Sequence, residues 1–145
     1  MRLSPRAVQG ASLVEVLVAV FVVSVGIFGV AALQGAALRS NQSASERTQG
    51  IIAAYSILES LRANRDAALA GDFDLALDET PGAGNSLAER DLRAWRAQLA
   101  SNLAGGNGAV DCSTAAPVCE VVVQWDDSRA VGGQQTETLQ LRSQL

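Results

Sequence analysis

The distribution of apolar residues divides the chain into two parts. Residues 16–38 form a run of 23 residues without a charge, and all 15 acidic residues except Glu15 follow this run. A helix rises about 1.5 Å per residue, so the run spans roughly 35 Å and exceeds a hydrocarbon core of about 30 Å. The pattern predicts a membrane-spanning helix over about residues 14–37.

The helical pattern continues beyond the apolar run. No proline occurs between Pro5 and Pro81, and apolar residues recur at three- and four-residue spacing as far as residue 61. We therefore expect one long helix over residues 11–68, with an amphipathic half over about residues 40–68. Its apolar residues Ile51, Tyr55 and Leu58 are expected to pack on the C-terminal domain, in preference to forming a partner-binding groove.

Residues 71–145 predict a small soluble domain. Residues 71–86 are rich in Gly, Asp and Pro and predict an acidic, solvated loop. Ser86 and Glu89 have the spacing of a capping box at the start of a short helix. The apolar stripe of this helix is Leu92, Trp95, Leu99 and Leu103. The arginines expected on its solvated face are Arg90, Arg93 and Arg96.

Alternating apolar residues predict strands in the last third of the chain. Residues 119–127 place Cys119, Val121, Val123 and Trp125 on one face. Residues 108–112 and 136–145 are candidate partner strands. The fold class predicted is α+β, with a long N-terminal helix packed on a small antiparallel sheet of about three strands and an extra short helix.

The two cysteines, Cys112 and Cys119, lie in the polar half of the chain with six residues between them. Closing this eight-residue loop stabilises a fold by about 2.5 kcal/mol in the chain-entropy model. The spacing differs from the CxxC of redox pairs, so we predict a structural disulfide formed in an oxidising compartment.

Composition limits the function classes. The chain has no histidine, and no nucleophile and base occur at motif spacing, so we expect no enzymatic activity and no cofactor. The acidic residues between 72 and 79 lack the glycine and terminal glutamate of a twelve-residue calcium loop, so we expect no metal site. A net charge of −4 argues against binding to nucleic acid.

Three interpretations fit the first 38 residues. A secretory signal would use Arg2 and Arg6 as its basic region, but its apolar region should be shorter. A plain signal anchor leaves Glu15 unexplained. The third interpretation rests on the segment "QGASLVEVLVAVFVVSVGIFG", which resembles the processing site of type IV prepilins and pseudopilins. That resemblance implies a cleaved leader over residues 1–10, with prepilin peptidase cutting between Gly10 and Ala11.

The same resemblance implies roles for individual residues. Ala11 becomes the N-methylated N-terminus, although family members usually carry Phe or Met there. Glu15 becomes the fifth residue of the mature chain and carries the assembly charge. Because an unpaired carboxylate is costly in an apolar environment, the new amine of Ala11, or that of a neighbouring subunit, is expected to offset it.

The segments "SLVEVLVAVFVVSVGIFGVAALQGAALRSNQSA", "AYSILESLRANRDAA" and "VVVQWDD" are similar to PilV-type minor pilins, the type IV pilus modification proteins. The similarity implies a pilin-like fold and a low-abundance subunit in a priming, tip-located complex that promotes pilus assembly. The implied partners are other minor pilins, the major pilin, prepilin peptidase and the inner-membrane assembly platform.

The implied location is the inner membrane, with a periplasmic head before assembly, and the pilus afterwards. The alternative within this class is a minor pseudopilin of a type II secretion system. A membrane-anchored binding module that does not assemble is the alternative from another class, and it predicts that Glu15 can be replaced without consequence.

Overall fold

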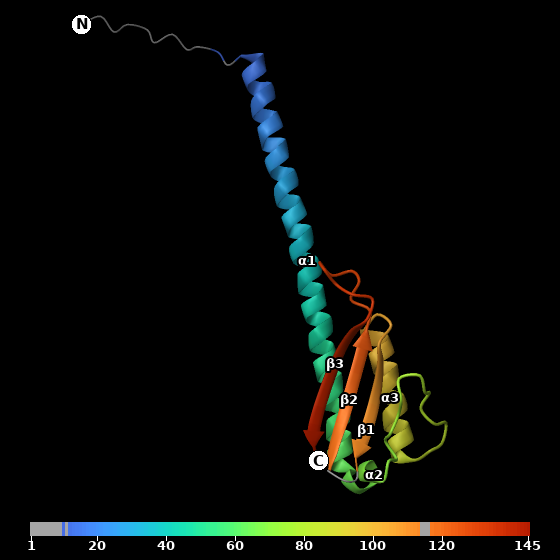
Figure 1. The fold of residues 1–145 in the computed structure, drawn as a ribbon. Coiled ribbons are helices and arrows are strands. Elements are labelled where there is room, and N and C mark those ends of the chain that lie inside the picture. Colours follow the sequence, from blue (N-terminus) through green and yellow to red (C-terminus); the bar gives the residue numbers. More distant parts are fainter. Residues whose placement is uncertain (1–9, 11, 114–116) are drawn as a thin grey trace, which may run out of the picture. The chain divides into compact units, whose positions relative to one another are not determined.

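The computed structural model describes residues 10, 12–113 and 117–145 (Figure 1). Its elements in chain order are α1 (Leu13–Ala63), α2 (Arg65–Leu69), α3 (Leu87–Asn102), β1 (Asn107–Ser113), β2 (Val118–Trp125) and β3 (Glu137–Gln144). The chain divides into two compact units, the first ending at Leu38 and the second running from Arg39 to Leu145. The second half of α1 therefore belongs to the same unit as the sheet.

The second unit is built on an antiparallel sheet with the strand order β1-β2-β3 (Figure 1). Burial alternates along the central strand β2, and its buried residues are Cys119, Val121, Val123 and Trp125. Strands with one covered face produce this two-residue period. The predicted sheet and its buried face are both confirmed.

The helix α1 packs into the core through both small and large residues. Its buried positions are Gly50, Ala53, Ala54, Ile57, Leu58 and Leu61. A Cβ built at Gly50 would lie 3.3 Å from the ring of Trp125, so the missing side chain makes room for that indole. Gly50 and the two alanines let this part of the helix approach the sheet closely, and Ile57, Leu58 and Leu61 are themselves almost completely buried in the core.

The prediction for the amphipathic half of the helix was therefore only partly right. Leu58 is buried as expected, but Ile51 and Tyr55 are 39% and 51% exposed. Three- and four-residue spacing does not show which apolar residues face the core. In the structure Ile57, Leu58 and Leu61 are buried, whereas Ile51 and Tyr55 lie outside the contact.

The single helix predicted to residue 68 is also interrupted. α1 ends at Ala63, and Asn64 leaves the helical region with φ −123° and ψ 45° before α2 begins at Arg65. The Ser60 carbonyl accepts from both the backbone amide and the side-chain amide of Asn64, at 3.1 and 2.9 Å, at the end of α1.

The short helix α3 begins with the predicted capping box. The Ser86 hydroxyl accepts from the Glu89 amide at 3.2 Å, and the Glu89 carboxylate accepts from the Ser86 amide at 3.1 Å. The four predicted stripe residues, Leu92, Trp95, Leu99 and Leu103, are all buried. The Trp95 indole N–H donates to the Ala53 carbonyl at 2.9 Å, and this bond ties α3 to α1.

Two of the three arginines on α3 do not form the solvated face that was predicted. Arg93 donates to the Gly82 carbonyl, and Arg96 donates to the carbonyls of Ala76 and Glu79 at 2.7 and 3.0 Å. These carbonyls belong to an irregular loop that lacks regular hydrogen-bond partners of its own, so the guanidinium groups satisfy them.

The loop over residues 71–86 also contributes to the core, which its acidic composition did not indicate. Phe73 and Leu75 are buried, and Leu75 forms an isolated antiparallel bridge with Val110 of β1. The Asp74 carboxylate accepts from the Cys112 amide at 2.9 Å. Removal of water from this carboxylate raises the pKa of Asp74, the Cys112 hydrogen bond lowers it, and the nearby charge of Asp111 raises it.

Taken by element, the chain has a long N-terminal apolar helix whose second half packs on a small three-stranded antiparallel sheet, with extra short helices. This is the α+β, pilin-like arrangement that was predicted.

Candidate functional site

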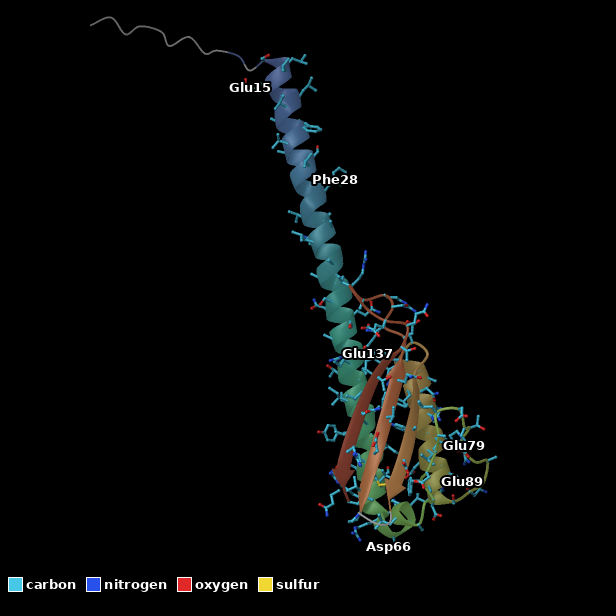
Figure 2. The ribbon with its side chains drawn as sticks, in the orientation of Figure 1. Glu15, Phe28, Asp66, Glu79, Glu89 and Glu137 are labelled. Carbon is cyan, nitrogen blue, oxygen red and sulfur yellow. A yellow bond between two sulfur atoms is a disulfide. The ribbon has the colours of Figure 1, made fainter. Side chains whose placement is uncertain are left out.

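The first candidate site is the part of α1 that lies in the first unit. By length and composition α1 can cross a membrane, and no part of its most apolar stretch is buried within the described structure. Phe28, labelled in Figure 2, is 77% exposed. An apolar surface of this length needs a covering phase or partner, and a lipid bilayer provides one. The segment is therefore compatible with membrane anchoring.

The small residues within this apolar segment are accommodated by the helix itself. The Ser24 hydroxyl donates to the Val20 carbonyl at 2.7 Å, so it satisfies its hydrogen bond within the helix. α1 is also continuous through Gly26, Gly29 and Gly35, and no side chain or distant backbone atom lies within 4 Å of a Cβ built at any of them. Small residues of this kind permit close contact between helices in a membrane.

A shallow groove runs along one face of this helical segment. Its lining residues are Val23, Gly26, Ile27, Val30, Ala31 and Gln34. They recur at three- and four-residue spacing, which places them on a single side of the helix. The absence of a side chain at Gly26 opens the groove in the middle of an otherwise bulky apolar surface.

Glu15 lies in the first turn of α1 and is labelled in Figure 2. The first backbone amides of a helix lack intrahelical acceptors and carry partial positive charge, so a carboxylate at this position is favourable. The Ser12 carbonyl accepts from the Val16 amide at 3.2 Å, which places Ser12 at the entry to the helix. No ion pair to Glu15 occurs among the described residues.

The sequence reasoning missed this helix-starting position of Glu15. Ser12 and Glu15 have the same Ser-x-x-Glu spacing as Ser86 and Glu89, which was recognised as a capping box. The same signal therefore could have located the start of α1. A carboxylate in the first turn of a helix is favourable by itself, so this position and charge pairing are two separate reasons for Glu15 and need different tests.

The predicted cleavage site lies immediately before this helix. Gly10 is exposed, and no atom beyond its neighbours lies within 4 Å of a Cβ built on it. Ala11, the predicted N-methylated residue, lies outside the described residues. Cleavage, methylation and the pairing of the Ala11 amine with Glu15 therefore stay predictions.

The second predicted feature, the disulfide, is present. Cys112 and Cys119 are bonded and lie directly opposite each other on β1 and β2, with a Cα–Cα distance of 4.1 Å. Both side chains are buried. A buried bond between paired strands fits a structural role, because attack by an external thiol requires access to the sulfur atoms.

Two carboxylates of the acidic loop over residues 71–86 accept hydrogen bonds from backbone amides. Asp74 accepts from the Cys112 amide, and the Glu79 carboxylate accepts from the Ala76 amide at 3.4 Å. Within the described ranges, no group of three or more His, Cys, Asp or Glu side chains is arranged to hold a metal ion.

Comparison of the chain with protein-family models, with curated protein sequences and with solved structures finds no match. Function therefore has to be inferred from the residues and their geometry.

Proposed function

We propose that this chain is a minor pilin of a type IV pilus, of the PilV type. In this proposal prepilin peptidase removes residues 1–10, Ala11 is N-methylated, and the mature subunit joins other minor pilins in a priming complex at the pilus tip. The major pilin and the inner-membrane assembly platform are its further partners. Before assembly, α1 anchors the subunit in the inner membrane with the second unit in the periplasm.

The observation that supports this proposal most directly is the order of features at the N-terminus. An exposed glycine is followed within a few residues by a helix that carries a carboxylate in its first turn and a long exposed apolar surface. An ordinary signal sequence places its cleavage site after the apolar segment. Here the predicted site precedes that segment, so the apolar helix remains in the mature protein and is available for lateral packing.

The second unit supports the same proposal. It combines a small core with a buried disulfide. A small core contributes little stability, and small domains in oxidising compartments are commonly stabilised by disulfides. The periplasm is such a compartment.

Deletion of the gene followed by counting of surface pili and measurement of protein secretion tests the assignment. The minor-pilin proposal predicts fewer pili with unchanged secretion, and restoration of pili by the wild-type gene. Loss of secretion with normal piliation would instead support the minor pseudopilin of a type II secretion system.

Variants at the processing site separate cleavage from assembly. Gly10→Leu is expected to block cleavage, seen as a subunit that retains its leader. Glu15→Ala is expected to be cleaved normally but to be absent from sheared pili.

Two matched variants then distinguish the charge of Glu15 from its capping position. Glu15→Gln keeps a side chain that a capping box accepts but removes the charge, and Ser12→Ala removes the hydroxyl that the Ser-x-x-Glu spacing offers for capping but keeps the charge. Charge pairing predicts that Glu15→Gln is lost from pili and that Ser12→Ala is incorporated. Normal incorporation of Glu15→Gln would contradict the charge-pairing account.

A further inference from the structure

The loop between β2 and β3, residues 126–136, has a compact internal structure. The Asp127 amide donates to the Gln134 carbonyl at 3.0 Å, which closes the base of the loop. The Ala130 amide donates to the Asp127 carbonyl at 2.9 Å, and the Gly133 amide donates to the Ala130 carbonyl at 3.2 Å. A Cβ built at Gly133 would overlap the Asp127 carbonyl, so glycine permits this close turn. These bonds hold the tip of the loop in a defined position.

The loop is attached to α1 at the start of the second unit. The Ser43 hydroxyl donates to the Asp127 carboxylate at 2.8 Å. Arg39, which lies one turn earlier in α1, lines a small hollow together with Ser43, Arg129 and Ala130. Figure 1 shows the loop, in orange-red, reaching the helix at this level. All of these residues belong to the second unit, so the attachment is a feature of that unit alone.

The continuity of the chain places this loop at the level of the membrane surface. Arg39 directly follows Leu38, the last residue of the uncharged run that is expected to cross the membrane. Ser43 comes five residues after Leu38, which is about 7.5 Å along a helix, and α1 is continuous over this stretch. The headgroup layer on each side of the hydrocarbon core is roughly 5–7 Å thick. Contacts with Arg39 and Ser43 therefore hold the loop beside the headgroups, and this does not depend on how the two units are oriented.

Val131 lies at the tip of the loop and is 64% exposed. Among the described residues of the second unit, the other exposed large apolar side chains belong to α1 and α3. A single exposed valine has no significance by itself. Beside a bilayer it has a favourable environment within reach, because an apolar side chain gains free energy when it moves from water to the boundary between headgroups and acyl chains.

The charges around the hollow are compatible with lipid phosphates. Among the described residues, no ion pair engages Arg39 or Arg129. The carboxylates of this region already accept hydrogen bonds within the chain, at Glu46, Asp126 and Asp127. Guanidinium groups form strong hydrogen bonds with phosphate oxygens, and arginines next to a membrane are attracted to anionic lipids.

We infer that the β2–β3 loop rests on the membrane surface, with Val131 at the boundary between headgroups and acyl chains and with Arg39 and Arg129 among the lipid phosphates. This second contact orients the second unit on the bilayer. The inference rests on the membrane anchoring of α1 in the proposed function and does not depend on the type of pilin. One loop tip binds a bilayer only weakly, so the contact forms while the spanning helix holds the loop in place.

The first test measures contact with lipid directly. The full chain is placed in liposomes of phosphatidylcholine and phosphatidylglycerol, with or without bromine on the acyl chains as a fluorescence quencher. Trp95 and Trp125 are buried, so the wild type gives the background. Val131→Trp is expected to lose at least half of its added emission in the brominated liposomes.

Leu87→Trp is the matched control, because Leu87 is also an exposed apolar residue of the second unit. It begins α3, whose 16 residues span about 24 Å. The other end of α3 lies near the loop, since the Asp126 amide donates to the Ala104 carbonyl just beyond it at 2.8 Å. The added emission of Leu87→Trp is therefore expected to be unchanged by bromine.

The second test uses a smaller residue, because tryptophan itself favours membrane interfaces. Val131→Cys and Leu87→Cys are reacted with N-ethylmaleimide in the same liposomes, and each rate is divided by the rate of the same variant in guanidinium chloride. Cys112 and Cys119 are bonded to each other and do not compete. A thiol in an apolar environment forms less of the reactive thiolate, so Val131→Cys is expected to be protected at least tenfold more than Leu87→Cys.

The outcomes separate the inference from the membrane anchoring on which it rests. Val131→Trp that floats with the liposomes but is quenched no more than Leu87→Trp overturns the inference alone. Equal protection of the two thiols also overturns it, because the tryptophan then inserted on its own account. Protection of Val131→Cys that disappears when the protein is diluted in lipid assigns the tip to a second copy of the chain. A wild-type chain that does not float with liposomes contradicts the anchoring itself.

Discussion

At the scale of single residues, the positions that matter most in the second unit are those where a side chain is missing. Gly50 makes room for Trp125, and Gly108 lies under Trp95 and Leu99. Both glycines face aromatic residues that the sequence pattern correctly placed in the core. Close packing of helices on a sheet leaves little free volume, so these positions tolerate little added volume.

Gly108→Ala is expected to destabilise the fold, because its Cβ would overlap the Trp95 ring and the Leu99 side chain. Overpacking of a well-packed core costs roughly 1–3 kcal/mol. Chemical denaturation of the full chain in detergent, followed by tryptophan fluorescence, measures the loss. The neighbouring Ala109→Ser is the control, expected to change stability by about 0.5 kcal/mol or less. An equal effect of both variants would contradict the packing account.

Asp74→Asn is expected to stabilise the protein at neutral pH. The folded state raises the pKa of Asp74 above its ordinary value, chiefly by removing water from the carboxylate. Its contribution to stability is therefore fully present below the ordinary pKa and is lost as the pH rises through the raised pKa. Asparagine keeps an acceptor for the Cys112 amide and does not ionise.

The measurement for Asp74→Asn is the thermal midpoint at pH 7 and at pH 3. The variant should exceed the wild type at pH 7, and the difference should disappear at pH 3. Asp72→Asn is the control for a general charge effect, because Asp72 and Asp74 are both exposed residues of this loop but only the Asp74 carboxylate accepts from the Cys112 amide. A stabilisation that is the same at both pH values would exclude titration of Asp74 as its cause.

At the scale of elements, the hairpin of β1 and β2 combines a strand register with a covalent bond. Cys112 and Cys119 face each other across the two strands, so the bond and the register support the same pairing. Both cysteines also belong to the core, together with residues of α1 and α3. The hairpin therefore links strand pairing to helix packing.

Replacement of both cysteines by serine is expected to reduce the free energy of unfolding by about 2.5 kcal/mol, the chain-entropy value for this loop, with a further loss from the buried hydroxyls. Denaturation of the variant and of the wild type, with and without reductant, measures the effect. The reduced wild type should fall between the two. No change on reduction of the wild type would show that the bond contributes no stability.

At the scale of the whole molecule, the chain has two units that differ in where their apolar side chains lie. The residues up to Leu38 expose apolar side chains along a helix, whereas the unit from Arg39 to Leu145 holds all of the buried core residues. Its core cluster buries Val, Leu, Ile and Trp residues around the sheet. The first unit is therefore compatible with membrane anchoring, and the second has a core of its own.

The full chain is expected to stay with membranes after alkaline carbonate extraction and to be released by detergent. A fragment beginning at Arg39 should remain in the aqueous fraction, because it lacks the apolar segment. Its thermal midpoint is expected to lie within a few degrees of that of the full chain, as the core and disulfide are retained. Release of the full chain by carbonate alone would contradict a spanning helix.

The sequence by itself determined the features that depend on local order along the chain. The apolar run, the capping box at Ser86, the alternation along β2 and the spacing of Cys112 and Cys119 each predicted an element that the structure contains. Periodicity and capping act between residues a few positions apart, so one sequence is enough to read them.

Only the tertiary structure decided the features that depend on contacts distant in sequence. It buried Ile57, Leu58 and Leu61 of α1 in the core and left Ile51 and Tyr55 exposed. It also assigned Arg96 to the loop carbonyls and closed the β1 edge with Leu75 while leaving the β3 edge open. These outcomes depend on which surfaces meet and on which backbone groups then lack partners, and neither is encoded by periodicity along the chain.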